Sequence, residues 1–88
     1  MKIHYTKRFL KQLARIPTLK RAKIESFVFE ILPLVRSVTE TGNIEKMQGY
    51  VDYYKVRFGS YRVGMKLEQD VLILEAVMDR KEIYRFFP

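Results

Sequence analysis

Apolar residues recur every three or four positions through the first third of the chain, which is the spacing of one helix face. The first such set follows Thr6 and consists of Phe9, Leu10, Leu13 and Ile16. Thr6 is a favourable N-cap residue, and Pro17 cannot continue a helix interior. The pattern therefore predicts a first helix that begins after Thr6 and ends at Pro17.

A second helical pattern starts immediately afterwards. We expect Thr18 to cap this helix and Pro33 to kink or end it. Its apolar side is predicted to consist of Ala22, Ile24, Phe27, Val28, Ile31 and Val35. Because so short a turn separates the two helices, they are predicted to form an antiparallel pair.

Alternation with a period of two marks the strands. A short strand is predicted over residues 1–5, and longer ones over 53–58 and 61–67, separated by a Gly59-Ser60 dipeptide typical of a type II′ hairpin turn. The apolar run 71–74 predicts a strand buried on both faces. Helices followed by strands indicate an α+β fold, in which a helical pair covers one face of an antiparallel meander. We expect residues 1–88 to form a single domain.

A two-residue turn fixes the register of the hairpin, so the residues that face each other are predictable. One face is apolar and is expected to lie against the helices. The other carries the cross-strand pairs Arg57–Arg62, Lys55–Gly64 and Tyr53–Lys66. Directly opposed like charges destabilise a sheet by about 0.2–1 kcal/mol, and a bound polyanion would remove that repulsion. The alternative is a solvated outer face, partly neutralised by Glu75.

The charge balance supports a polyanionic partner without identifying it. Seventeen Lys and Arg stand against ten Asp and Glu, giving a net charge of +7. Such a charge attracts nucleic acid, acidic proteins or anionic membranes. With no cysteine and one histidine, a cysteine nucleophile and a His-clustered metal site are excluded. No apolar run approaches the roughly 20 residues of a membrane span. These features predict a cytoplasmic domain without metal or cofactor and without membrane association.

The C-terminal segment follows the last predicted strand. An antiparallel connection would return Arg80 and Tyr84 to the neighbourhood of the hairpin. A tyrosine beside arginines offers a base-stacking surface and a phenolic proton. The simpler interpretation is that Tyr84, with Phe86 and Phe87, closes the end of the core.

The order of these parts resembles the RelE/ParE superfamily of bacterial and archaeal toxins. The resemblance rests on the alternating run 53–64, the apolar strand after it and the segment Arg80-Lys81-Glu82-Ile83-Tyr84-Arg85. It implies two helices packed on a curved antiparallel sheet. It also implies a cognate antitoxin as partner and one of two targets. RelE members cleave messenger RNA on the ribosome, whereas ParE members poison DNA gyrase.

Carried over by position, the RelE resemblance implies a set of functional residues. These are Lys55, Arg57, Arg62, Arg80 and Tyr84, with Tyr53 and Lys66 expected to contact RNA. Metal-free RNA cleavage uses the adjacent 2′-hydroxyl as nucleophile and needs a base, an acid and cationic stabilisation. Because arginine does not release its proton, the three arginines are expected to stabilise charge. Either Tyr84 or Lys55 would then be the base.

Two features depart from the family pattern. Met78 and Asp79 stand where many members have glycine and then histidine or lysine, and an acid there could weaken phosphate binding or tether Arg62 or Arg80. The sequence stops at Pro88, which predicts that the C-terminal helix of some members is missing. A ParE-like gyrase inhibitor and a non-catalytic RNA-binding domain therefore remain as alternatives to a ribosome-dependent messenger RNA nuclease.

Overall fold

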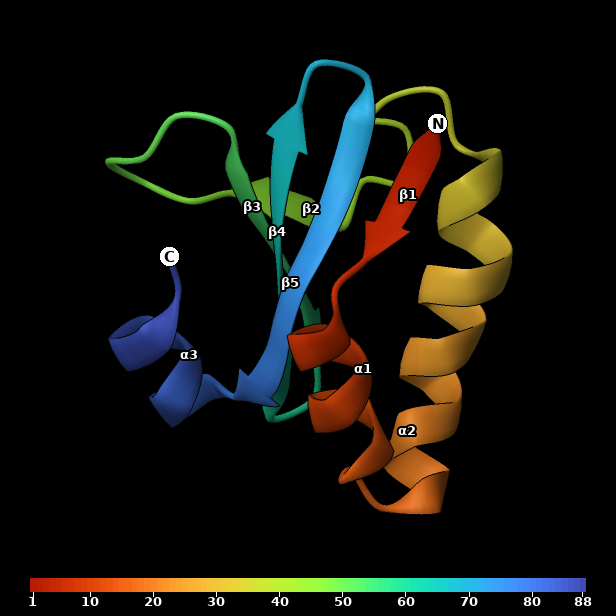
Figure 1. Cartoon of the computed structure of the whole chain (residues 1–88), viewed down its shortest axis with the longest axis vertical. Coiled ribbons are helices and arrows are strands. Elements are labelled where there is room, and N and C mark those ends of the chain that lie inside the picture. Colours follow the sequence, from red (N-terminus) through yellow and green to blue (C-terminus); the bar gives the residue numbers. More distant parts are fainter.

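The computed structural model describes residues 1–88 as one mixed α+β fold (Figure 1). The elements in chain order are β1(Lys2–Tyr5), α1(Lys7–Ala14), α2(Thr18–Glu25), the π-helical stretch η1(Ser26–Ile31), the 3-10 turn η2(Leu32–Leu34), β2(Ile44–Lys46), β3(Tyr53–Phe58), β4(Tyr61–Glu68), β5(Val71–Asp79) and α3(Arg80–Phe86). None of the helices is both long enough and apolar enough to cross a membrane.

The five strands form one sheet in the order β1-β5-β4-β3-β2. Strands β3 to β5 form the predicted antiparallel meander, and the short β2, which was not predicted, adds antiparallel to β3. Strand β1 pairs parallel to β5, with Ile3 opposite Leu72. The sheet is therefore mixed rather than purely antiparallel. The sequence pattern did not reveal this because the pairing joins the two ends of the chain, and β1 alone carries no mark of its partner.

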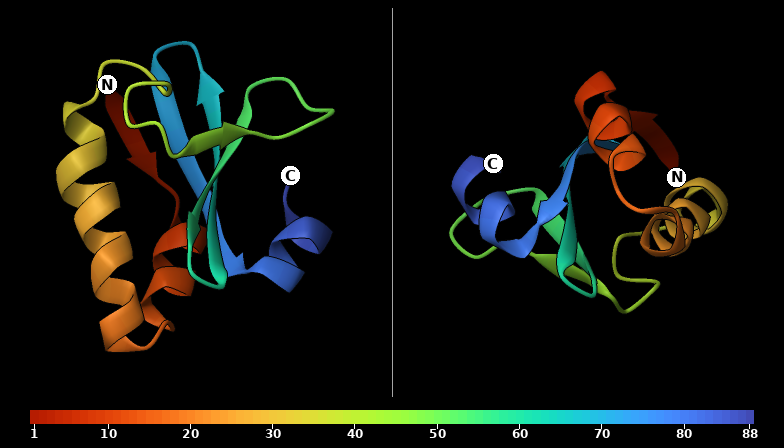
Figure 2. Two further views of the ribbon diagram at one scale, coloured as in Figure 1. Left: turned by 180° about the vertical axis from the view of Figure 1, so that it is seen from behind. Right: turned by 90° about the horizontal axis from the view of Figure 1, so that it is seen from below.

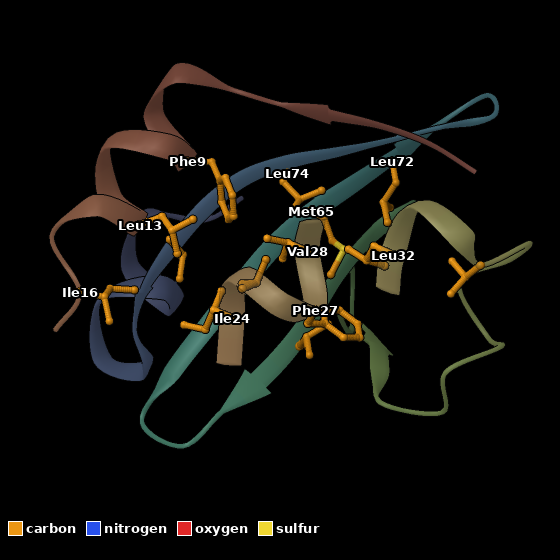
Figure 3. Packing of buried hydrophobic residues seen from close by; sticks show 14 residues of the cluster. Phe9, Leu13, Ile16, Ile24, Phe27, Val28, Leu32, Met65, Leu72 and Leu74 are labelled. Atoms are coloured by element: carbon orange, nitrogen blue, oxygen red, sulfur yellow. The ribbon is translucent and has the colours of Figure 1, made fainter. Parts of the chain in front are cut away.

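Helices cover both faces of the sheet. Figure 2, seen from below, shows α1 and the helix that starts with α2 on one side and α3 on the other. The face under α1 and α2 carries the main core, whose residues Figure 3 shows as sticks. Fourteen buried residues form it: Phe9, Leu13, Ile16, Ile24, Phe27, Val28, Leu32, Val35, Val56, Val63, Met65, Leu72, Leu74 and Val77. In β5 only Leu72 and Leu74 of the run 71–74 are buried, so that strand is not enclosed on both faces there.

The second helix differs from its predicted apolar side at two positions. Ala22 and Ile31 are exposed, and Leu32 is fully buried instead. For Ile31 and Leu32 the physical reason is η1, because its wider turns shift the phase of the helix by about one residue. Ala22 lies before η1, on the exposed side of α2. Leu10 of α1, also predicted to face the core, is 43% exposed. As predicted, the helical segment ends at Pro33, since Val35 is already extended.

The two helix starts give opposite outcomes for the predicted caps. Thr6 is the N-cap of α1, where its Oγ1 accepts a hydrogen bond from the Phe9 amide at 3.1 Å and donates one to the Leu74 carbonyl at 2.8 Å. The prediction for Thr18 is wrong, since Pro17 occupies the N-cap position of α2 without a side-chain bond. Proline pre-sets the backbone angle that a helix start needs.

Replacing Thr6 by alanine is expected to lower the free energy of unfolding by about 1–2 kcal/mol. The variant loses the cap and the hydroxyl bond to the Leu74 carbonyl, while the backbone amide of residue 6 keeps its own bond to that carbonyl at 3.2 Å. Urea denaturation measures the change. The matched control is Thr18→Ala, which should shift stability by less than about 0.5 kcal/mol because that side chain is exposed and caps nothing. Equal losses in both variants would contradict the assignment of the cap.

The outer face of the sheet carries a second, smaller buried cluster under α3. It consists of Met47, Ala76, Ile83 and Phe87. Gly64 makes room for it, because a Cβ atom at that position would lie 2.6 Å from the Phe87 ring. Gly64 is therefore a point of close approach, and its lack of a side chain is used for docking α3 onto the sheet.

Candidate functional site

The predicted hairpin register is confirmed at every position. Residues 53–58 of β3 pair with 61–66 of β4, so that Arg57 lies opposite Arg62, Lys55 opposite Gly64 and Tyr53 opposite Lys66. Gly59 has a positive φ of 59° while Ser60 does not, as a type II′ turn requires. The cations of the hairpin thus share the outer face of the sheet, on the side that α3 partly covers.

Helix α3 brings Tyr84 to Lys55, 29 residues away in the sequence. The Lys55 ammonium Nζ donates a hydrogen bond to the Tyr84 hydroxyl at 2.9 Å and lies 4.9 Å from the centroid of its ring. The buried side chain of Ile83, the residue just before Tyr84, anchors this turn of α3 on the sheet. Tyr84 itself is 57% exposed, so its hydroxyl is open to an incoming ligand.

The cations around Tyr84 change its acidity. The hydrogen bond from Lys55 is the main effect that holds the pKa of the Tyr84 phenol below its usual value. The charges of Lys55 and Arg62 act in the same direction, and together they outweigh the opposing effect of partial desolvation. The site therefore shifts the ionisation equilibrium of Tyr84 toward the phenolate, which is the proton-accepting form.

Arg62 supplies charge from below the surface. It is only 8% exposed, and its Nη1 donates to the carbonyls of Gly59 at 2.7 Å and Tyr61 at 3.0 Å. Its Nε is buried without a hydrogen-bond partner. Arg62 thus ties the hairpin turn together, and it acts on Tyr84 through its electrostatic field.

Arg57 is the exposed member of the opposed arginine pair. Its side chain is 59% exposed, and Nη2 lies 3.5 Å from a carboxylate oxygen of Glu45 on β2. Glu45 pairs with Lys55 across the β2–β3 ladder. The acidic neighbour of these cations is therefore Glu45. The predicted neutraliser, Glu75, forms no ion pair. Glu45 beside Arg57 and the turn carbonyls bonded to Arg62 relieve part of the repulsion between these two opposed arginines.

Arg80 and Asp79 mark the start of α3 beside the hairpin turn. The Arg80 amide donates to the Ser60 carbonyl at 2.8 Å, and its side chain is exposed. Asp79 is the N-cap, whose carboxylate accepts from the Lys81 amide at 2.9 Å. It pairs with neither Arg62 nor Arg80. Asp79 thus has a structural role as the cap of α3. The prediction that a C-terminal helix is missing is wrong, because α3 follows β5 directly.

Tyr53 and Lys66 lie at the other end of the same face. The Tyr53 ring packs edge-on against Phe87 and Tyr50, with centroid distances of 5.6 and 6.1 Å. Lys66 places its Nζ 5.6 Å from the centroid of the Tyr53 ring and 3.7 Å from a carboxylate oxygen of Glu68. These two residues therefore form a second group, separate from the Lys55–Tyr84 pair.

Two features of the site were missed by the sequence analysis, and only one of them had a signal in the sequence. Asp79 followed three residues later by Glu82 is close to a capping-box pattern, and it precedes the apolar pair Ile83 and Phe87 with helical spacing. That combination indicates α3. By contrast, β2 has only three residues, too few for a reliable periodic signal, so Glu45 was not recognisable. No group of three or more His, Cys, Asp or Glu side chains is placed to hold a metal ion.

Comparison with known proteins extends over nearly the whole chain. Residues 3–84 match the family described as ParE toxin of type II toxin-antitoxin system, parDE. Toxin RelE3 of Methanocaldococcus jannaschii is 35% identical over 89 residues, with 100% of both chains covered.

Solved structures agree with this match. A chain of the RelB-RelE antitoxin-toxin complex from Methanococcus jannaschii has a TM-score of 0.77 and 32% identity, with 97% of this chain and 99% of that chain covered. The intact E. coli RelBE toxin-antitoxin complex gives a TM-score of 0.67 at 22% identity over 89% and 94% of the chains, which shows a shared fold. The chain therefore belongs to the RelE/ParE superfamily, as a RelE-like toxin of a type II toxin–antitoxin system.

Proposed function

We propose that this toxin cleaves messenger RNA on the ribosome by attack of a 2′-hydroxyl on the adjacent phosphate. The observation that carries the proposal is the Lys55–Tyr84 pair. An exposed phenol with a lowered pKa, held at 2.9 Å by an ammonium group, is suited to accept the proton of a ribose hydroxyl. The surrounding arginines supply the positive charge that a phosphorane-like transition state needs.

The geometry favours Tyr84 as the base rather than Lys55. In their hydrogen bond the Lys55 ammonium donates and the phenol oxygen accepts, and this contact is the main cause of the lowered pKa of Tyr84. Attacking and leaving oxygens lie on opposite sides of the phosphorus in an in-line displacement. Two groups 2.9 Å apart lie on the same side, so they act as one unit, in which Lys55 positions Tyr84 and promotes its ionisation.

The arginines divide into two roles. Arg57 and Arg80 are exposed and contact the phosphate directly, whereas the buried Arg62 acts on Tyr84 and on the shape of the turn. In the reaction the 2′-oxygen forms a bond to phosphorus and the bond to the 5′-oxygen breaks. The products are a cyclic phosphate and a free 5′-hydroxyl, whose proton comes from water. Ordering of the messenger by the ribosome supplies much of the remaining rate enhancement.

A cognate antitoxin is the proposed regulatory partner. RelE-type relatives have been solved as complexes with RelB, including the Methanococcus jannaschii pair at 32% identity. The net charge of +7 suits an acidic partner protein as well as RNA. We expect the antitoxin to keep this toxin inactive until it is removed.

A toeprinting assay with purified toxin, ribosomes and a translated message tests the proposed function. We expect the message to be cut within codons, and only when ribosomes are present. The description of the matched family names ParE, so the same preparations are also incubated with gyrase and supercoiled DNA. Intact message together with trapped gyrase–DNA complexes would replace the nuclease by a gyrase poison. Salt-sensitive RNA binding without cleavage would make it a binding domain.

The pH dependence of cleavage follows from the lowered pKa of Tyr84. Below that pKa, the phenolate fraction rises about tenfold per pH unit, so the rate should rise with pH and level off at a lower pH than a free tyrosine would give. Single-turnover rates at saturating ribosome complex between about pH 6 and pH 9 measure this profile. A flat profile under conditions where chemistry is rate-limiting would remove Tyr84 as the base.

A further inference from the structure

The loop between β2 and β3 displays an aromatic ring that neither core uses. Tyr50 is 49% exposed and its neighbour Val51 is 76% exposed. The centroid of the Tyr50 ring lies 6.1 Å from that of Tyr53, and the two ring planes meet at 74°. About half of the Tyr50 side chain is therefore open to a ligand.

The loop is held in a defined shape although it projects from the sheet. Its backbone bonds run from the Met47 amide to the Tyr53 carbonyl at 2.8 Å and from the Leu67 amide to the Asp52 carbonyl at 2.8 Å. Gly49 and Asp52 both have positive φ, of 85° and 66°. Aspartate is one of the few residues besides glycine that commonly adopts this left-handed conformation, so both positions fix the course of the loop.

The loop borders an open, shallow hollow of about 590 Å³, which Tyr50 lines together with Lys46 and Gln48. Lys46 lies opposite Tyr54 in the β2–β3 ladder, so it belongs to the helix-covered face of the sheet. The cation on the outer face beside the loop is Lys66, whose Nζ lies 5.6 Å from the centroid of the Tyr53 ring. A ring, an ammonium group and an amide can stack on a base, neutralise a phosphate and bond to the base edge.

The hollow is close to the proposed cleavage site. Tyr53 is two residues before Lys55 on the same face of β3, a step of about 6.8 Å. The Tyr50 ring lies 6.1 Å from the ring of Tyr53. The two steps together span at most roughly 13 Å, a distance that a few nucleotides of a single strand cover. One RNA segment can therefore occupy both places.

We infer that Tyr50 is a base-stacking platform for a nucleotide of the substrate that flanks the scissile phosphate. Lys66, on the same outer face as Tyr53, contacts the backbone of that segment, and Gln48 is the side chain in the loop that can bond to the edge of the stacked base. The inference rests on the proposed function, which it deepens by extending the RNA-binding site from the Lys55–Tyr84 pair to the loop. Cations alone would bind RNA without ordering its bases, whereas a ring at this position fixes where the strand lies.

A fluorescence assay tests the platform. The probes are short RNAs that carry 2-aminopurine at one position each, and 2′-O-methyl groups block their cleavage. Full-length wild-type toxin should quench the probe at one preferred position. Tyr50→Ala is expected to weaken binding about 5- to 100-fold and to abolish the quenching. Tyr50→Leu should do the same, and since leucine keeps an apolar side chain in the loop, its loss of binding separates stacking from loop packing. Tyr50→Phe retains the ring and with it the quenching.

Leu34→Ala is the matched control, because Leu34 is an exposed apolar residue of η2, 81% exposed and outside the loop. Thermal unfolding of each variant checks that the fold is retained. If wild type fails to quench the probe, or if Tyr50→Ala and Tyr50→Leu bind as wild type does, the platform is ruled out. The cleavage proposal then still stands provided that the toeprinting cuts appear. Absence of those cuts with intact quenching would overturn the nuclease and keep the RNA site.

Discussion

Replacing Tyr84 by phenylalanine is expected to lower the rate of ribosome-dependent cleavage about 10²- to 10⁴-fold, the usual contribution of a general base. The substitution removes one oxygen atom, the acceptor of the Lys55 hydrogen bond. The ring and the packing of α3 remain. Because the phenol is exposed, the free energy of unfolding should change by less than about 0.5 kcal/mol. Single-turnover cleavage on programmed ribosomes measures the rate.

A control on the same strand distinguishes a base from a general effect of losing a tyrosine hydroxyl. Tyr54 lies on the opposite face of β3, packed against the main core, and its hydroxyl forms no hydrogen bond within the protein. Tyr54→Phe should therefore cleave within about twofold of the wild-type rate. A Tyr84→Phe variant that retains full activity would leave Lys55 as the group that moves the proton.

Replacing Ile83 by alanine is expected to disable cleavage without touching any polar residue of the site. Ile83 is fully buried in the small cluster that docks α3, and truncating such a residue costs about 2–5 kcal/mol. A seven-residue helix has little stability of its own, so α3 should detach from the sheet and carry Tyr84 away from Lys55. Hydrogen exchange of the α3 amides and cleavage rates at a temperature where the fold persists measure both effects.

The matched control for Ile83 is Ile24→Ala, an equally buried isoleucine in the main core. That variant should lose similar global stability while α3 stays docked and cleavage continues below its melting temperature. If Ile83→Ala cleaves at the wild-type rate while folded, the position of Tyr84 does not depend on the docking of α3.

The hairpin was predictable to the residue because its signals are local. A two-residue turn that begins with Gly59 permits one register, and that register alone decides that Lys55, Arg57 and Arg62 share a face. The same argument could not predict which of these cations is buried and which acceptor each of them contacts. Arg62 is buried on the turn carbonyls, and Arg57 lies beside Glu45, because those outcomes depend on neighbours from β2 and from the backbone itself.

The surroundings of Tyr84 show where local reasoning stops. The sequence placed this residue near the hairpin but left open whether it only closes the core. The structure has Ile83 and Phe87 inside the small cluster, while Tyr84 is exposed and bonded to Lys55. Helical periodicity explains the division, since residues 83 and 87 are four apart and share one side of α3.

By itself the sequence determined the two helices, the three long strands, the hairpin register and the excess of positive charge, because periodicity and turn chemistry act between residues close in the chain. Only the tertiary structure decided that β1 joins β5 in parallel, that Gly64 admits the Phe87 ring and that Lys55 meets Tyr84. Those contacts join residues 23 to 69 positions apart. Such pairings are selected by the packing of the whole sheet between its two helical layers, and no local pattern encodes them.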